Sequence, residues 1–276
     1  MISQYESAYQ NLVNEVVTFG EHRQSRAGPT RQVFGATLSI DCLPQGQFPL
    51  LTGRKMYPTP VFGELAAFLV GATDLQTFRD LGCNYWDTNA EAWGSNDGLE
   101  PTYWKVGQIY GAQWRSWRGE GYDQLAVLIN ELTENPFSRR HLLTTYDPEE
   151  QNACLPPCHL LAQFNVTNDG ALDCCVYMRS VDLCLGLPSD VVLYSGLLLL
   201  ISKEVGLNPG RLLFVFGDAH IYENHVSTWS KQVKAEKHTL PLYKLIPGAK
   251  LWDFKPTDIQ IIGYEHSGKL EYQFNV

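Results

Sequence analysis

Hydrophobic residues recur along the chain at spacings that predict both helices and strands. Apolar positions at helical spacing predict four helices, over residues 5–18, 61–70, 123–132 and about 191–205. Alternating or continuous apolar runs predict four strands, over residues 32–40, 172–178, 211–216 and 258–264. The polar, Arg-rich stretch 21–31 contains Gly28-Pro29 and is typical of a mobile surface loop. With no repeat or linker in view, these elements predict one α/β (α+β) domain over residues 1–276.

Composition narrows the class of protein. A chain of 276 residues with 44% hydrophobic content can bury a sizeable core. The net charge of −9 argues against a nucleic-acid-binding surface, which is usually basic. We see no apolar run near the roughly 20 residues that span a bilayer and no signal-peptide pattern at residues 1–6, so no membrane association is expected. Seven cysteines, an odd number, suggest reduced thiols in a cytoplasm.

A candidate nucleophile follows two prolines. Pro156-Pro157 restricts the backbone, so Cys158 is expected to emerge from a rigid bend. A buried structural cysteine is the alternative reading. Two sets of residues contain side chains that can bind a metal: Cys154, Cys158, His159 and Cys174, and Asp218, His220 and His225. The first set has no paired CxxC spacing, and in the second the histidines are five residues apart, so no metal is expected.

Other polar residues stand at the ends of apolar elements. Arg179-Ser180 follows a predicted strand, and a guanidinium beside a hydroxyl suits a phosphate. Glu64 is the one charge in the apolar helix 61–70. It is either on an exposed helix face or a buried carboxylate whose raised pKa would suit general acid/base chemistry.

Several blocks of sequence resemble the signature blocks of the thymidylate synthase family, which includes the pyrimidine hydroxymethylases. The likeness spans nearly the whole chain in order. The blocks are Phe48-Pro49-Leu50, Gly63-Glu64-Leu65, Tyr85-Trp86-Asp87, Ile109-Tyr110-Gly111-Ala112-Gln113-Trp114-Arg115, Ser138-Arg139-Arg140, Pro157-Cys158-His159, Met178-Arg179-Ser180-Val181-Asp182, Leu185-Gly186-Leu187-Pro188-Ser189-Asp190 and Gly217-Asp218-Ala219-His220-Ile221-Tyr222-Glu223-Asn224-His225.

The resemblance implies a fold and a chemistry. The fold would be a large mixed sheet flanked by helices, with one sheet face forming a homodimer interface. Cys158, its pKa lowered by nearby arginines such as Arg179, would attack C6 of a pyrimidine nucleotide. Carbon C5 would then take a one-carbon unit from 5,10-methylenetetrahydrofolate. Glu64 would organise water and proton transfer, and Tyr110 would assist removal of the C5 proton.

The resemblance also implies binding roles. Phosphate would be held by Arg26, Arg179, Ser180 and, from the other subunit, Arg139 and Arg140. Arg23 and Arg31 are alternatives to Arg26. The alternative for residues 138–140 is an ordinary basic segment exposed to solvent. The sugar 3′-hydroxyl would be bound by His220 and Tyr222, and the folate by Arg54, Trp86, Asp182, Gly186 and Val276, with the C-terminal tail folding over it.

Asp190 carries the substrate inference. Ordinary thymidylate synthases have asparagine at the matching position, and its amide suits uracil. Cytosine reverses the donor and acceptor at position 4 and N3, and a carboxyl group that shares a proton matches it. The alternative is that Ser189 or Asp190 is the N-cap of the helix that follows. Met178 also resembles deoxycytidylate enzymes, whereas His159 and residues 185–188 resemble the synthases.

The favoured function is therefore hydroxymethylation of dCMP in the cytoplasm of a bacterium or a phage-infected cell, where phages use the product to protect their DNA. The alternatives are dCMP methylation, thymidylate synthesis from dUMP, and action on CMP. A catalytically silent nucleotide- or RNA-binding paralogue is disfavoured, because Cys158, Glu64 and the phosphate arginines are present and the charge is acidic.

Overall fold

A computed structural model of the chain describes residues 2–149 and 152–275. The helices are α1 (Gln4–Phe19), α2 (Pro58–Leu69), α3 (Leu75–Asp80), α4 (Asp87–Glu91), α5 (Tyr110–Arg115), α6 (Gln124–Glu134), α7 (Gly186–Glu204) and α8 (Val226–Lys234), with short 3-10 helices η1 (Leu43–Gln45), η2 (Gly94–Asn96), η3 (Pro101–Tyr103), η4 (Glu223–His225) and η5 (Leu251–Asp253). The strands are β1 (Glu21–Ser25), β2 (Gly28–Phe34), β3 (Thr37–Ile40), β4 (Leu142–Thr144), β5 (His159–Val166), β6 (Ala171–Asp182), β7 (Asn208–Tyr222), β8 (Leu242–Leu245) and β9 (Ile259–Ile262).

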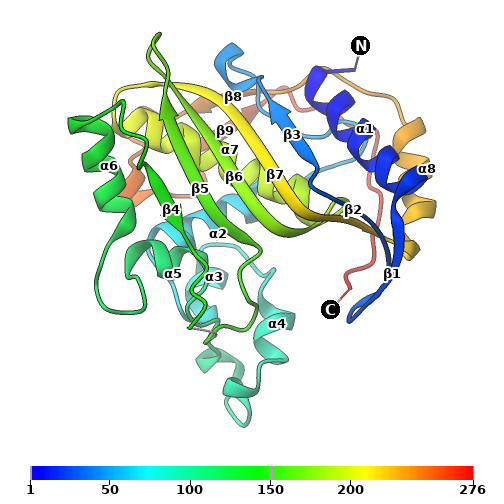
Figure 1. Cartoon of the computed structure of the whole chain (residues 1–276), viewed down its shortest axis with the longest axis horizontal. Coiled ribbons are helices and arrows are strands. Elements are labelled where there is room, and N and C mark those ends of the chain that lie inside the picture. The colour runs from blue at the N-terminus through cyan, green and yellow to red at the C-terminus, as the bar shows by residue number, and fades with distance from the viewer. Residues whose placement is uncertain (1, 150–151, 276) are drawn as a thin grey trace.

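Seven strands form one mixed sheet. Its order is β1-β2-β7-β6-β5-β4, with β3 also pairing β7 (Figure 1). The β6–β7 pair is parallel, and α7 makes the crossover between them; the other pairs are antiparallel. The predicted α/β class, with a large mixed sheet flanked by helices, is confirmed. Strands β8 and β9 form a separate two-stranded sheet.

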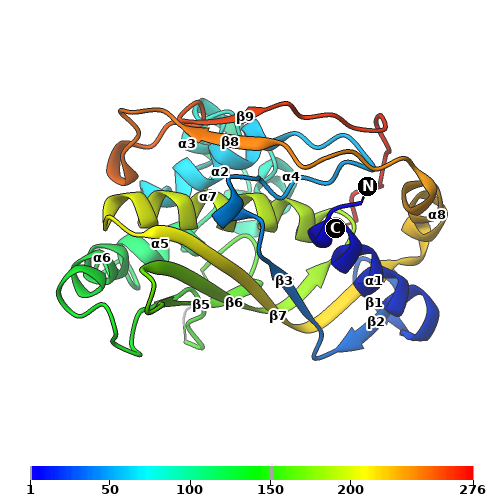
Figure 2. The ribbon, with the colours of Figure 1, turned by 90° about the horizontal axis from the view of Figure 1, so that it is seen from above.

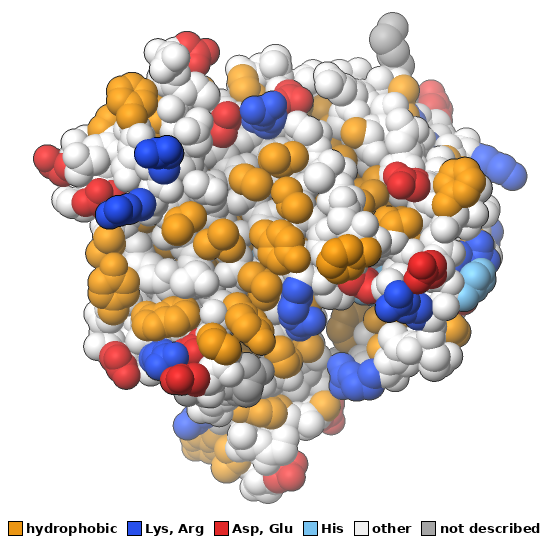
Figure 3. Space-filling model, in the orientation of Figure 1, with side chains coloured by type: hydrophobic (Ala, Val, Ile, Leu, Met, Phe, Trp, Pro, Cys, Tyr) orange, Lys and Arg blue, Asp and Glu red, His pale blue; other side chains and the backbone are white. Residues whose placement is uncertain are grey.

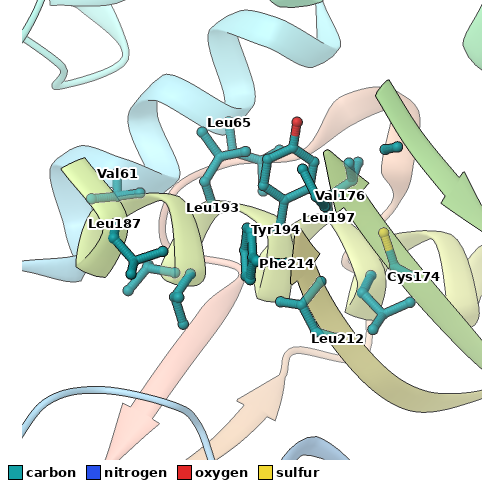
Figure 4. Packing of buried hydrophobic residues seen from close by; sticks show 14 of the residues in the cluster. Val61, Leu65, Cys174, Val176, Leu187, Leu193, Tyr194, Leu197, Leu212 and Phe214 are labelled. Carbon is teal, nitrogen blue, oxygen red and sulfur yellow. The ribbon is translucent and has the colours of Figure 1, made fainter. Parts of the chain in front are cut away.

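The helices lie on one side of the large sheet. Viewed from above, α7 runs along that face, with α2 and the β8–β9 pair stacked farther out (Figure 2). Residues of α7 interdigitate with residues of α2, β6 and β7 (Figure 4): Leu187, Leu193, Tyr194, Leu197, Val61, Leu65, Cys174, Val176, Leu212 and Phe214. Leu197 is fully buried, so Leu197→Ala would cost about 2–5 kcal/mol of stability. This core holds the strand ends that carry the polar residues.

The opposite face of the sheet is not covered by any helix of the described chain, and apolar side chains gather on it (Figure 3). Leu161 of β5, Tyr177 of β6 and Val215 of β7 lie in register across it. Cys175 and Leu213 form a neighbouring pair in the same register. An apolar sheet face of this extent is typical of a protein–protein interface.

Three of the predicted elements need correction. Residues 21–31 are not a loop but contribute to the β1–β2 hairpin. Hydrogen bonds between the two backbones hold these polar strands together, so the sequence shows no apolar strand pattern. The strand predicted over 32–40 is interrupted at Gly35, which adopts φ 88°. Helix α7 begins at Gly186, earlier than predicted, and carries Pro188 in its first turn, where proline is tolerated.

The length of α7 also corrects the expectation about apolar runs. By length and composition this helix could cross a membrane, but 78% of its apolar window is buried inside the structure. Burial of this kind is typical of a core helix enclosed by a sheet and other helices.

Candidate active site

Cys158 lies immediately before β5 and is held by groups from two other elements. Its backbone N–H donates to Tyr110 Oη at 3.0 Å, and its carbonyl accepts from the Arg179 N–H at 2.9 Å. The Arg179 side chain donates from Nε to Pro157 O at 2.7 Å and from Nη2 to Pro156 O at 2.8 Å. The two proline rings fix φ in this turn, and the Arg179 side chain ties down its two proline carbonyls. The thiol is therefore presented by a rigid bend, as predicted.

Helix α5 places Tyr110 against the cysteine because it packs unusually closely on α2. A Cβ added at Gly111 would lie 2.1 Å from the Phe68 Cα, so only glycine fits there. The Tyr110 and Phe68 rings lie 5.1 Å apart, and burial raises the Tyr110 pKa well above its usual value. Tyr110 therefore remains a neutral phenol that accepts from the cysteine backbone.

The Cys158 pKa does not follow the prediction from the sequence. Burial raises it above its ordinary value and outweighs the Arg179 charge, which lowers it. The Asp190 carboxylate adds a further raising effect. The expectation that arginines lower this pKa is therefore wrong in its net direction, because desolvation of the thiolate is the larger effect.

Asp190 lies inside α7 and not at its start. The N-cap is Leu185, and the Ser189 hydroxyl donates back to the Leu185 carbonyl at 3.3 Å. The N-cap reading of Ser189 and Asp190 is therefore wrong. Asp190 Oδ1 instead lies 2.9 Å from His159 Nε2, and both side chains are largely buried.

His159 is the site residue that sequence reasoning missed as a functional group. Its ring lies 4.6 Å from the Tyr110 ring and 5.3 Å from the Tyr194 ring, which fixes its orientation. Its Nδ1 is buried and has no hydrogen-bond partner in the described chain. Its position directly after Cys158 was the available signal, but only the fold brings Asp190 to its other nitrogen.

Glu64 projects from α2 toward the same group of residues. Its Oε1 accepts from Trp86 Nε1 at 2.8 Å. Burial raises the Glu64 pKa to about 7; the Trp86 hydrogen bond opposes the shift, and the Asp190 charge adds to it. A carboxyl group with this pKa can hold or release a proton near neutral pH. The buried-carboxylate reading of Glu64 thus fits the structure better than the exposed-face reading.

The three candidate N-terminal arginines differ in their partners. Arg31 forms a bidentate pair with Glu223, at 2.9 and 3.1 Å, and Arg23 pairs with Glu21 at 2.9 Å. Arg26 lies in the β1–β2 turn, is exposed and has no ion pair in the described chain. Its charge acts to lower the pKa of Tyr222. Of the three arginines, Arg26 is thus the one without an ion pair in the described chain, and its role in phosphate binding stays a prediction.

Arg139 and Arg140 lie on the exposed segment between α6 and β4. Neither guanidinium forms a hydrogen bond or ion pair with a described residue of its own chain. The structure does not bring them to Cys158 by any such contact within the described chain.

The β6–β7 pairing collects the remaining predicted residues. Ser180 lies opposite Asp218, and Asp182 lies opposite His220. His220 Nδ1 is 2.7 Å from Asp218 Oδ1, and its ring meets the Tyr222 ring at 5.3 Å. Asp182 Oδ1 accepts from the Cys184 and Leu185 amides, in the turn that leads to Gly186 at the start of α7.

Arg54 is buried beneath the C-terminal tail. Its Nη2 donates to Cys184 O, and its guanidinium carbon lies 4.9 Å from the centre of the Tyr272 ring. Its Nε is buried without a hydrogen-bond partner in the described chain. Val276, also expected at the folate site, falls outside the described residues.

Comparison with known proteins decides the family. The family model described as "Thymidylate synthase" matches residues 7–276. The chain belongs to the thymidylate synthase family. It is 35% identical over 277 residues to "Thymidylate synthase 1/2" of Encephalitozoon cuniculi (strain GB-M1), covering 94% of each sequence. Members of this family are homodimers that bind a pyrimidine nucleotide and transfer a one-carbon unit from methylenetetrahydrofolate to C5 with a catalytic cysteine.

Proposed function

We propose that this member of the thymidylate synthase family acts on dCMP and makes 5-hydroxymethyl-dCMP. The observation that carries the proposal is the placement of Asp190, where family synthases have asparagine, 2.9 Å from His159 Nε2 and within the electrostatic reach of Cys158. A carboxyl group here matches cytosine better than an amide does.

The argument depends on where one proton lies. An ionised carboxylate only accepts, so it can take a hydrogen bond from the cytosine amino group but cannot donate to N3. A carboxyl group that carries a proton on Oδ2 donates it to N3, while Oδ1, which lies 2.9 Å from His159 Nε2, accepts from the amino group. A proton donated to N3 draws electron density from C6, which favours attack by the Cys158 sulfur.

The reaction divides among the residues of the site. The Cys158 thiolate forms a bond to C6 and moves an electron pair to C5, which bonds the methylene supplied by 5,10-methylenetetrahydrofolate. Loss of the C5 proton, assisted by Tyr110, releases the folate. Glu64, with a pKa of about 7, holds the water that adds to the remaining exocyclic methylene. Electrons then return to expel Cys158, and the product carries a hydroxymethyl group.

The folate would contact several residues around this site. The Trp86 indole N–H donates to Glu64, which places the ring beside that carboxyl group. Arg54 has a buried Nε without a partner in the described chain, and it can donate to an anionic or carbonyl group. Asp182 and Gly186 lie at the junction of β6 and α7, and Val276 would close the site with the tail. The buried orphan donor on Arg54 supports the fit of a polar cosubstrate here.

The product could instead be a methyl group, which requires hydride transfer from the folate in place of water. Ser189 stands where the synthases have phenylalanine, which supports greater access of water and hence hydroxymethylation. The name of the Encephalitozoon relative favours a second candidate, thymidylate synthesis from dUMP.

Product mass spectrometry separates these candidates. Purified protein would be incubated with 5,10-methylenetetrahydrofolate and an equal mixture of dCMP and dUMP. A gain of CH2O on dCMP is expected. A gain of CH2 on dCMP would identify a methylase, and product from dUMP alone would overturn the cytosine reading of Asp190.

We propose that Arg139 and Arg140 act across the dimer. The apolar sheet face supplies the contact surface, and both guanidinium groups are free of partners in the described part of their own chain. Mixing inactive Cys158→Ser protein with inactive Arg139→Ala/Arg140→Ala protein should restore part of the activity, because one heterodimer site contains only native residues. Failure to recover activity, with subunit exchange demonstrated, would refute the crossing.

A further inference from the structure

Three potential metal ligands converge beside the C-terminal tail. Asp182 ends β6, Cys184 follows in the turn to α7, and His225 ends η4. One ligand atom from each lies within 4.8 Å of the other two. Cys184 and His225 are fully buried, and the Asp182 side chain is 18% exposed. This combination differs from both candidate metal sets in the sequence.

The hydrogen bonding of His225 leaves one nitrogen aimed into the cluster. Nε2 lies 2.7 Å from the Gln273 carbonyl, which can only accept, so Nε2 carries the hydrogen. Asn275 Nδ2 lies 3.2 Å from the same nitrogen but has the Gln273 carbonyl as its own acceptor at 3.1 Å. Nδ1 of the neutral ring therefore presents a lone pair, and it has no hydrogen-bond partner in the described chain.

That lone pair faces a second electron-rich atom. His225 Nδ1 lies 3.7 Å from Asp182 Oδ1, too far for a hydrogen bond. A histidine that donates one N–H to a backbone carbonyl while its other nitrogen faces a carboxylate has the arrangement of a metal-binding histidine. A cation between these atoms would satisfy a buried nitrogen that the protein itself leaves unpaired.

We propose that Asp182, Cys184 and His225 form a binding site for a divalent transition metal of the zinc type. Nitrogen, sulfur and oxygen ligands together suit Zn²⁺, and its bond lengths place tetrahedral atoms of these three kinds about 3.3–3.6 Å apart. The separation of 3.7 Å between Asp182 Oδ1 and His225 Nδ1 exceeds the oxygen–nitrogen distance by only about 0.2–0.4 Å. The sulfur needs to move inward by about 1.3 Å at most, given the 4.8 Å limit on the set.

The thiol proton of Cys184 and the positive charge of Arg54 both oppose binding of the ion. Burial, followed by the Asp182 charge, raises the Cys184 pKa, so metal must displace the thiol proton. The Arg54 guanidinium, bonded to the Cys184 carbonyl, adds a positive charge nearby.

Cobalt titration tests the proposal without relying on turnover. The intact chain, free of nucleotide and folate because Asp182 is also a proposed folate contact, would be titrated with Co²⁺ and then Zn²⁺. We expect one Co²⁺ per chain, with a thiolate-to-cobalt charge-transfer band that Zn²⁺ abolishes. Cys184→Ser should remove the band, and Asp182→Asn should weaken binding at least tenfold. Cys154→Ser and Cys158→Ser are the matched controls and should retain it.

Two outcomes would overturn the site. Absence of the charge-transfer band in the intact protein would show that the cluster holds no metal. A band that survives Cys184→Ser but disappears in Cys158→Ser would place the ion on the reactive thiol. If His225→Gln is poorly folded, the Cys184→Ser and Asp182→Asn results still decide the question.

Discussion

Replacing Asp190 with asparagine tests the substrate assignment with a nearly isosteric change. The asparagine oxygen can still accept from His159 Nε2, so the 2.9 Å contact can persist without the negative charge. The amide would no longer match cytosine at position 4 and N3, but it would match uracil at both atoms. The variant should therefore shift its preference from dCMP toward dUMP.

The size of the shift follows from burial. The side chains of Asp190 and His159 are 16% and 8% exposed, so water cannot readily replace a lost partner. Each buried polar group left unpaired costs about 1–3 kcal/mol, so two mismatches cost about 2–6 kcal/mol. Each 1.4 kcal/mol corresponds to about a factor of ten. The dCMP/dUMP ratio of kcat/KM should therefore decrease by a factor of about 30 to about 20,000.

The assay is steady-state kinetics with each nucleotide separately and then in direct competition. Asp173→Asn is the matched control, because Asp173 is similarly buried, at 22% exposure, but lies at the far end of β6 against Arg211. It should leave the ratio unchanged. A ratio in Asp190→Asn equal to that of the native protein would refute the role of Asp190 in base selection, although the carboxyl group would still orient His159.

Three further predictions concern single residues. Cys158→Ser should abolish turnover while nucleotide binding by calorimetry persists, whereas Cys154→Ser in the same loop should remain active. Glu64 has a pKa raised from 4.5 to about 7, so ionising it costs the folded state about 3 kcal/mol. The free energy of unfolding of the native chain should therefore fall as the pH rises through this range. In urea unfolding, the stability of Glu64→Gln relative to the native chain should increase between about pH 5 and about pH 8. Plots of unfolding free energy against pH that run parallel for the two proteins would contradict the raised pKa. Glu6 is fully buried and accepts from Thr52 and Gly53, so Glu6→Gln should lose about 2–3 kcal/mol in denaturant unfolding, with exposed Glu15→Gln as the control.

The amino-acid sequence alone determined the fold class, the rigid bend at Cys158 and the helices with strong apolar periodicity. Helix α6 illustrates why: Asp123 caps it by accepting from the Ala126 N–H, and its apolar residues repeat at helical spacing. Both signals are local, so they can be read from neighbouring residues. The family was also visible in the sequence, because its motif blocks occur in order along the chain.

Only the tertiary structure decided the features that depend on distant partners. The β1–β2 hairpin is held by strand pairing, which the polar sequence of these strands does not predict. The net rise in the Cys158 pKa reflects burial outweighing the charge of Arg179. The contact of Asp190 with His159 joins two elements, and the approach of His225 to Asp182 does the same. These distances are set by how α7 crosses between β6 and β7, and therefore by packing of the whole core and not by any local run of residues.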